Sequence, residues 1–303
     1  MGVRGEICAR GGGWRAVCCE GIRDPMTERA RPVYYDNHMH TPLCKHAQGE
    51  PEEYAEQAVR RGLKGIIFTC HSPMPDNWWP NVRMSPEQLD EYIAMVERAR
   101  EAYAGRLDVR LGMESDFFPG YEWWIERLNE RCDFHHVLGS VHFFGKDYRE
   151  RYWKGDPVAF QRCYFGHLAE SAETGLFDTL AHPDLVKNHS PADWDLEVIG
   201  EDIAAALDRI ARTGVAMELN TSGLHKTVRE FNPGPGMLRM MCERGIPVVL
   251  GSDSHHPGRV ASHFGEALDV LESVGYRSVS YFLGRKRQDI VIGEVRASLR
   301  SEK

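Results

Sequence analysis

Short apolar runs alternate with longer helical patterns from Val33 onward, and this alternation constrains the fold more than any other feature of the chain. Seven runs precede a last one at 278–282; they cover 33–37, 65–70, 107–113, 134–141, 177–181, 215–219 and 247–251. Strands that alternate with helices build parallel sheets. The pattern therefore predicts an α/β fold made of seven βα units.

Residues that commonly bind metals recur just past the ends of these runs, and Asn220 takes that place after the sixth. They are seven histidines, one glutamate and one aspartate: His38, His40, His46, His71, Glu114, His142, His182, Asp253 and His255. Barrel enzymes carry their chemistry at the C-terminal ends of the strands, where the loops converge. The mixture of imidazoles and carboxylates suits Zn, Mn or Fe, and shared carboxylates indicate more than one ion.

The spacing within two segments sharpens this prediction. His38 and His40 lie two residues apart on a strand end, so both imidazoles can point to one ion. Asp36 shares their face and is expected to orient an imidazole from behind. Asp253 is expected on the first ion and His255 on a different one.

Glu114 follows the third run and is expected to bridge two ions. A buried carboxylate without cations is costly, so the alternative is a salt bridge. The sequence shows no obvious cation near it. We therefore favour the bridging role.

A multinuclear site of this kind suits the hydrolysis of phosphate esters, because the ions bind phosphoryl oxygens and activate water. The chain has no P-loop, dinucleotide-binding fingerprint or Ser/Cys nucleophile motif. We expect metal hydroxide to be the nucleophile, without a covalent intermediate. Asp253, Glu114 and His255 are the expected catalytic residues; the general acid, Asp253 or a metal-bound water, stays open.

Composition narrows the class of protein further. The net charge of -8 argues against a protein that coats nucleic acid, and no apolar run approaches the length of a membrane span. Eight cysteines without a CxxC pair favour reduced thiols and a cytoplasmic protein. Cys44 and Cys70 flank predicted ligands, and small buried residues are favoured over thiolate ligands. The oligomeric state is left open.

The first 32 residues lack an apolar signal-peptide core and are predicted to form a disordered leader, with Met26 as a possible native start. Residues 33–303 are predicted to form the catalytic domain. The sequence thus indicates one domain after a leader.

In order along the chain, His38-x-His40 with His46, then His71, Glu114, His142, Ala181-His182-Pro183 and Asp253-x-His255 resemble the PHP superfamily, named for polymerase and histidinol phosphatase. The resemblance covers about residues 34–282. It implies a distorted (β/α)7 TIM-like barrel with three divalent metal ions. The implied ligand sets are His38, His40, Glu114 and Asp253 for one ion, Glu114, His142 and His182 for the second, and His46, His71 and His255 for the third.

The segments 112–117, 139–142, 218–223 and 279–282 are similar to the histidinol-phosphatase branch of that superfamily. The resemblance implies hydrolysis of L-histidinol phosphate to L-histidinol and phosphate, a step of histidine biosynthesis. Such a substrate needs a cationic clamp, an acidic group for its ammonium and an aromatic surface for its imidazole. The candidates are Lys187, Arg229 and Arg259 for the clamp, Asp116 for the ammonium, Trp78 or Trp79 for the imidazole, and Asn220, which either donates to substrate or satisfies backbone; His225 and His256 are further loop candidates.

Three alternatives remain. A PHP phosphoesterase for nucleotide or sugar phosphates would share all nine ligands. A metal-dependent amidohydrolase often carries a modified lysine at a strand end, and no lysine ends a strand here. A non-catalytic metal-binding module would have lost ligands, and none is missing.

Overall fold

The computed structural model describes residues 30–76 and 78–300. Predictions about Met26 and nearly all of the leader lie outside these residues. The strands of the described part are β1 (Tyr35–Asp36), β2 (Gly65–Phe68), β3 (Asp108–Leu111), β4 (Met113–Asp116), β5 (Val137–Ser140), β6 (Thr179–Leu180), β7 (Ala216–Asn220), β8 (Val248–Gly251), β9 (Ser278–Leu283) and β10 (Lys286–Val291).

These strands form two sheets that close on each other. One has the order β1-β2-β3, and the other has the order β10-β9-β8-β7-β6-β5-β4. The neighbours pair in parallel except β9 and β10, which form an antiparallel hairpin. Isolated parallel bridges join Met39 to Ser254 and His71 to Glu114, one at each seam between the sheets. The predicted α/β barrel of parallel strands is confirmed.

The seam near Glu114 arises from a break at Gly112. A side chain there would lie 2.5 Å from the backbone oxygen of His136 and 2.8 Å from Thr69, so only glycine allows this close approach. Before the break β3 pairs with β2, and after it β4 pairs with β5. The prediction of one strand over 107–113 that ends before Glu114 was therefore wrong, because Glu114 lies inside β4.

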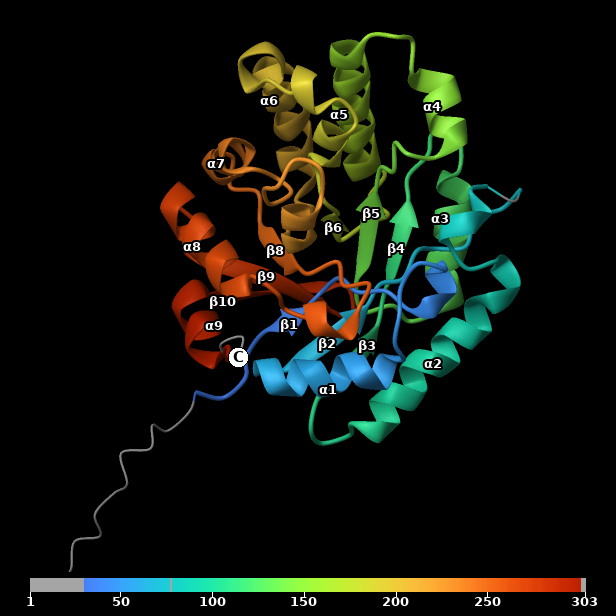
Figure 1. The fold of residues 1–303 in the computed structure, drawn as a ribbon, viewed down its shortest axis with the longest axis vertical. Helices are drawn as coiled ribbons and strands as arrows, with labels where there is room; N and C mark the ends of the chain where they lie inside the picture. The colour runs from blue at the N-terminus through green and yellow to red at the C-terminus, as the bar shows by residue number, and fades with distance from the viewer. Residues whose placement is uncertain (1–29, 77, 301–303) are drawn as a thin grey trace, which may run out of the picture.

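Helices surround the strands, as Figure 1 shows. They are α1 (Pro51–Arg61), α2 (Leu89–Ala102), α3 (Glu122–Arg131), α4 (Lys146–Tyr152), α5 (Pro157–Glu173), α6 (Leu196–Thr213), α7 (Pro235–Glu243), α8 (Phe264–Val274) and α9 (Ile292–Ser298). Local signals fix several ends: α1 begins at Pro51 and ends at Arg61, directly before Gly62, whose φ of 76° suits a left-handed cap. Ser85 and Gln88 form a capping box ahead of α2.

Three elements were not predicted. The helix α4 buries only Tyr148 and so has a weak apolar pattern in the sequence. The strand β10 and the helix α9 follow the expected terminal strand. Lys286 and Arg287 begin β10, whose side chains are mostly exposed.

The core fills the barrel and the space between strands and helices. Every residue of β2, β4, β5, β7 and β8 is buried, because helices cover the outer face of the parallel strands. Among the described residues, no helix has the length and apolar character needed to cross a bilayer.

The strands from β1 to β9 pair in parallel. Their C-terminal ends therefore share one end of the barrel.

Candidate metal centre

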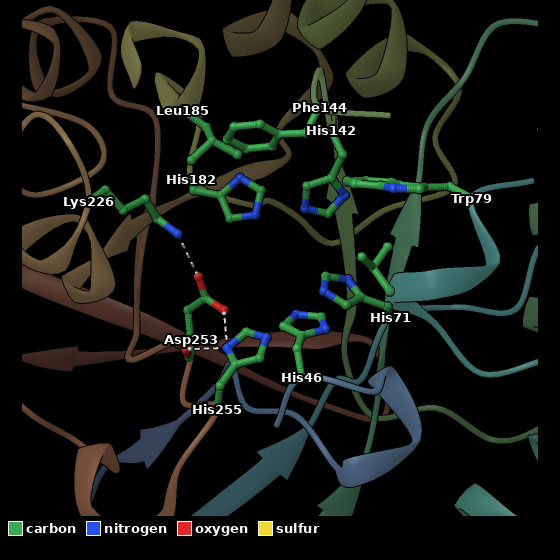
Figure 2. Close-up of a pocket in the computed structure, with 11 residues that line it drawn as sticks. His46, His71, Trp79, His142, Phe144, His182, Leu185, Lys226, Asp253 and His255 are labelled. Carbon is green, nitrogen blue, oxygen red and sulfur yellow. Dashed lines mark hydrogen bonds and ion pairs between the residues drawn. The ribbon is translucent and has the colours of Figure 1, made fainter. Parts of the chain in front are cut away.

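The predicted ligands meet at that end of the barrel, around a cavity of about 140 Å³. Figure 2 shows imidazoles from separate strand ends facing this cavity, with Asp253 among them. Its walls are His46, His71, Trp79, Val82, His142, Phe144, His182, Leu185, Lys226, Asp253 and His255. His38, His40 and Glu114 lie deeper and are completely buried.

The first group contains His38, His40 and Asp253, whose ligand atoms all lie within 4.8 Å of one another. Nε2 of His40 is 3.2 Å and Nε2 of His38 is 3.7 Å from Oδ1 of Asp253. Oε2 of Glu114 lies 3.5 Å from Nε2 of His38 and 3.7 Å from Nε2 of His40. The structure thus brings together the four residues expected for one ion.

Glu114 also faces the second group through its other oxygen. Oε1 lies 3.0 Å from Nε2 of His182 and 3.5 Å from Nε2 of His142. One carboxylate therefore stands between two sets of imidazoles, the arrangement expected of a bridging ligand.

The third group is less compact than the resemblance implies. The ring centroid of His46 lies 4.5 Å from that of His255 and 5.4 Å from that of His71, but the ring centroids of His71 and His255 are 6.1 Å apart. Nδ1 of His71 instead lies 2.7 Å from Oε2 of Glu114. His71 thus occupies a place between the third group and the other two.

Buried ligand atoms that form no hydrogen bond provide a test of whether this site fits metal ions. Buried polar atoms nearly always form hydrogen bonds, and exceptions call for an explanation such as an ion. The buried atoms here that make no hydrogen bond include Nε2 of His38, both nitrogens of His40, Nδ1 of His71, Oε2 of Glu114, Nδ1 of His182 and Nε2 of His255. Several face the same small volume, so the residues fit divalent ions.

The protonation of the site follows from the same crowding. Burial alone would raise the pKa of Glu114, but the surrounding imidazoles, first that of His71, hold it well below its ordinary value. Burial alone would lower the pKa of His38, but the carboxylates of Glu218, Glu114 and Asp253 hold it well above its ordinary value. Glu114 and His38 thus stabilise each other's charged forms.

Glu218 supports two of the ligands and was missed from the sequence. Oε1 accepts a hydrogen bond from Nδ1 of His38 at 2.8 Å, and Oε2 accepts one from the backbone N–H of His182 at 2.8 Å. Nδ2 of Asn220 donates to the same Oε2 at 3.0 Å. Residues two apart on a strand share a face, so the pair 218 and 220 on an inward-facing strand was the available signal.

Asn220 is fully buried, which bears on the role left open for it. Its Oδ1 accepts hydrogen bonds from the backbone N–H and from the hydroxyl of Ser222. Its amide donates to Glu218. These contacts favour satisfaction of local groups over donation to substrate.

Asp116 does not face the cavity, contrary to the expected ammonium contact. It is fully buried, with Nη1 of Arg83 at 2.5 Å and Nδ1 of His142 at 2.5 Å. Both of its oxygens are thereby committed. Asp116 orients the imidazole of His142, and Arg83, also missed from the sequence, balances its charge.

Asp36 also differs from its prediction, because it contacts no imidazole. Its carboxylate accepts hydrogen bonds from the backbone N–H groups of Ser252 and Ala261 and from the hydroxyl of Ser252. It therefore ties β1 to the loop after β8, which carries Asp253 and His255. Its effect on the ligands acts through the backbone.

The expected phosphate clamp needs a similar revision. Lys187 is completely buried, and its Nζ contacts Asp184 at 2.9 Å, Glu230 at 2.8 Å and the carbonyl of Phe231 at 2.8 Å. Arg229 and Arg259 are exposed and do not line the cavity. Lys226, which the sequence did not single out, is the lysine in its wall, with Nζ 3.7 Å from Oδ2 of Asp253.

The aromatic candidates separate clearly. Trp79 lines the cavity, and its ring centroid lies 6.1 Å from that of His142. Trp78 is buried against Phe118 and does not line it. His225 and His256 do not line it either.

Comparisons with known proteins agree with this geometry. The family model described as the PHP domain matches residues 36–222. A "Probable histidinol-phosphatase" of Deinococcus radiodurans is 42% identical over 259 residues, which cover 84% of this chain and 98% of that protein. The "Histidinol-phosphatase" of Bacillus subtilis is 28% identical, covering 74% of this chain and 94% of that protein.

A solved structure supports the fold. The histidinol phosphate phosphatase of Lactococcus lactis, crystallised with zinc, L-histidinol and phosphate, aligns with a TM-score of 0.72 at 19% identity. The alignment covers 84% of this chain and 98% of that one. With the family match over most of the barrel and a relative 42% identical along nearly its whole length, this chain belongs to the PHP domain family.

Proposed function

We propose that this chain is a metal-dependent histidinol-phosphatase, which hydrolyses L-histidinol phosphate to L-histidinol and phosphate. The observation that carries the proposal is the group of seven imidazoles and two carboxylates at one end of the barrel, most of them along one cavity. The names of the relatives in D. radiodurans and B. subtilis supply the substrate. L-histidinol and phosphate, which the L. lactis structure contains, are the products of the same reaction.

His38, His40, Glu114 and Asp253 would hold one ion, and Glu114, His142 and His182 a second. His46 and His255 would hold a third, with His71 shared between positions. Such ions supply Lewis acidity toward the phosphoryl group and an activated water for hydrolysis. The protein's part is to fix the ligands, which Glu218 and Asp116 do from behind.

Lys226 is the candidate for charge on the phosphate side of the cavity. It is a cation in the wall, and its side chain is 31% exposed, so it can turn from Asp253 toward a phosphoryl oxygen. A lysine supplies a point charge and up to three donors to phosphate. We expect it to lower KM for a phosphate ester.

An apolar part of the cavity wall suits the imidazole of the substrate. Figure 2 shows Trp79 beside His142, across the cavity from Lys226, with Phe144 between His142 and Leu185. Aromatic rings favour stacked or edge contacts with another planar ring. A sugar would gain less from these surfaces than an imidazole, which favours histidinol phosphate over the alternative esters.

The test is kcat/KM for L-histidinol phosphate against nucleotide and sugar monophosphates, with protein loaded separately with Zn, Mn or Fe(II). We expect a value within the usual enzyme range of about 10⁴–10⁸ M⁻¹s⁻¹ for L-histidinol phosphate and far lower values for the others. Even activity across the panel would contradict the substrate and keep the phosphatase. Hydrolysis of amides in place of esters would favour the amidohydrolase alternative.

Lys226→Met provides a test of the phosphate contact, with Arg229→Met as the matched control because Arg229 is exposed outside the cavity. Loss of one charge-assisted hydrogen bond, worth about 1.5–3 kcal/mol, should raise KM by about 10–100-fold. Arg229→Met should leave KM within about twofold on the same scale. Equal effects of the two substitutions would contradict the assignment.

A further inference from the structure

Two cysteines lie against the metal centre without a part in the proposed reaction. Cys44 ends the 3-10 turn Pro42–Cys44 and lies two residues before His46. Cys70 follows β2 and directly precedes His71. Both side chains are completely buried, and neither forms a disulfide in the structure.

The two sulfurs and His40 form a compact group. The Sγ atoms of Cys44 and Cys70 and a ring nitrogen of His40 all lie within 4.8 Å of one another. The Thr41 hydroxyl donates to Sγ of Cys70 at 3.3 Å, which fixes that sulfur beside the ring. Groups this close can be drawn onto one ion by small side-chain rotations.

The imidazole of His40 supplies a second, independent observation. Its Nε2 lies 3.2 Å from Oδ1 of Asp253, on the side of the carboxylates. Its Nδ1 is buried and has no well-oriented hydrogen bond, and Cys70 is the side chain beside the ring on that side. An ion bound on the sulfur side would give Nδ1 a partner.

We propose that Cys44, Cys70 and Nδ1 of His40 form a thiolate site for a thiophilic divalent ion such as Zn²⁺, Cd²⁺ or Co²⁺. Two sulfurs and one imidazole nitrogen are three of the four ligands of a tetrahedral thiolate site. Each thiol loses its proton to solvent when the ion binds, so two protons leave per ion and nothing is oxidised.

His40 links this site to the group of His38, His40 and Asp253, because one ring faces both. The two positions are therefore coupled, and the ion held by sulfur biases the whole centre toward metals that accept thiolate. Mn²⁺ prefers oxygen and nitrogen ligands and gains nothing from the sulfurs. This inference goes beyond the proposed function and does not depend on the substrate.

The test uses the full chain, reduced with a phosphine, stripped of metal and titrated with Co²⁺. A thiolate on Co²⁺ gives an intense near-ultraviolet charge-transfer band that histidine and carboxylate ligands do not give. Cys44→Ser and Cys70→Ser should each lower the band by at least about half, because one of the two thiolates is lost. Cys132→Ser is the control, because Cys132 is half-buried and belongs to no such group.

Three results would overturn the proposal. The first is the absence of the band, and the second is a band that neither variant changes, which would place the sulfur elsewhere in the chain. The third is a band lost only in Cys44→Ser, because Cys44 also lies within 4.8 Å of His46 and His255 and would then serve their ion alone.

A measurement on the unaltered chain guards against variants that fail to fold. Zinc X-ray absorption of the loaded protein should show sulfur at about 2.3 Å in addition to nitrogen and oxygen at about 2.0–2.2 Å. A spectrum fitted by nitrogen and oxygen alone would also overturn the proposal.

Discussion

Replacement of Arg83 by methionine tests the charge balance behind the metal centre. Arg83 is 2% exposed and its guanidinium lies 2.5 Å from the fully buried carboxylate of Asp116. Methionine keeps much of the apolar stem but removes the charge. Among the described residues, Asp116 would then keep only His142 as an ion-pair partner.

The expected loss of stability follows from these contacts. Breaking a buried ion pair by removing one partner costs about 3–5 kcal/mol, because a charge stays buried without compensation. Arg83 also donates to the carbonyls of Ser72 and Trp79 at 2.9 and 3.3 Å. Burial alone would raise the pKa of the Asp116 carboxyl, and Arg83 contributes most to holding that pKa well below its ordinary value. Without Arg83 the pKa should rise, and uptake of a proton by Asp116 would then limit the loss of stability. We therefore expect about 4 kcal/mol.

The assay is urea unfolding of the metal-free protein at pH 8, followed by circular dichroism, with a check that the slope of free energy against urea is unchanged. Arg98→Met is the matched control, because Arg98 is half-exposed and pairs with Glu50 and Glu52 at the surface. Such surface pairs contribute about 0–1 kcal/mol. Adding Asp116→Asn to Arg83→Met should recover part of the loss, because it removes the uncompensated charge.

Two results would refute this reasoning. One is a loss for Arg83→Met no larger than that for Arg98→Met. The other is strict additivity in the double variant, which would mean that Arg83 and Asp116 do not interact.

Three further substitutions test other parts of the molecule. Glu218→Gln should weaken metal binding by about 10–100-fold, measured by competition with a chelator, because it loosens His38 and the backbone of His182; unchanged affinity would contradict its role. Lys187→Met should lower the free energy of unfolding by about 3–5 kcal/mol, because the buried charge of Asp184 loses its partner. A change in KM without this loss of stability would instead support a contact between Lys187 and the phosphate. Burial, with Arg151 adding to it, lowers the pKa of His167 to about 4, against about 6.5 in the unfolded chain. The folded protein then binds fewer protons than the unfolded chain between these values, so stability should fall as the pH drops through this window. His167→Gln, which keeps an acceptor for Tyr148, should flatten that fall by about 1–2 kcal/mol in urea titrations at pH 7 and pH 5.

The strands and the residues that follow them could be predicted because both depend on local pattern. An apolar run that ends in histidine or aspartate fixes the residue's place at the end of the barrel, whatever the rest of the chain does. Helix ends also depend on local signals, as for α1, which has Pro51 at its first position and Gly62 directly after its last. The break at Gly112 could not be predicted, because its cause is a contact with His136 and Thr69 from neighbouring strands.

The predictions of substrate contacts were wrong for the same reason. Lys187 and Lys226 both lie in loops after strands, and nothing local distinguishes them. Their partners do: Lys187 meets Glu230, which is 43 residues away, whereas Lys226 reaches the cavity wall. Asp116 likewise has no local signal that distinguishes it, because its partner Arg83 lies 33 residues earlier. The role of such a charged side chain depends on its partners in the folded protein.

The contacts behind the ligands indicate how far the fold depends on metal. Glu218 holds His38, Asp116 holds His142, and Asp36 holds the loop of Asp253, each through hydrogen bonds that require no ion. Small zinc domains unfold without metal because the ion replaces a core. Here a continuous core runs from Tyr34 to Val295, so the ligands are positioned before any ion arrives. Loss of metal should therefore remove the chemistry of this site while the barrel that presents it persists.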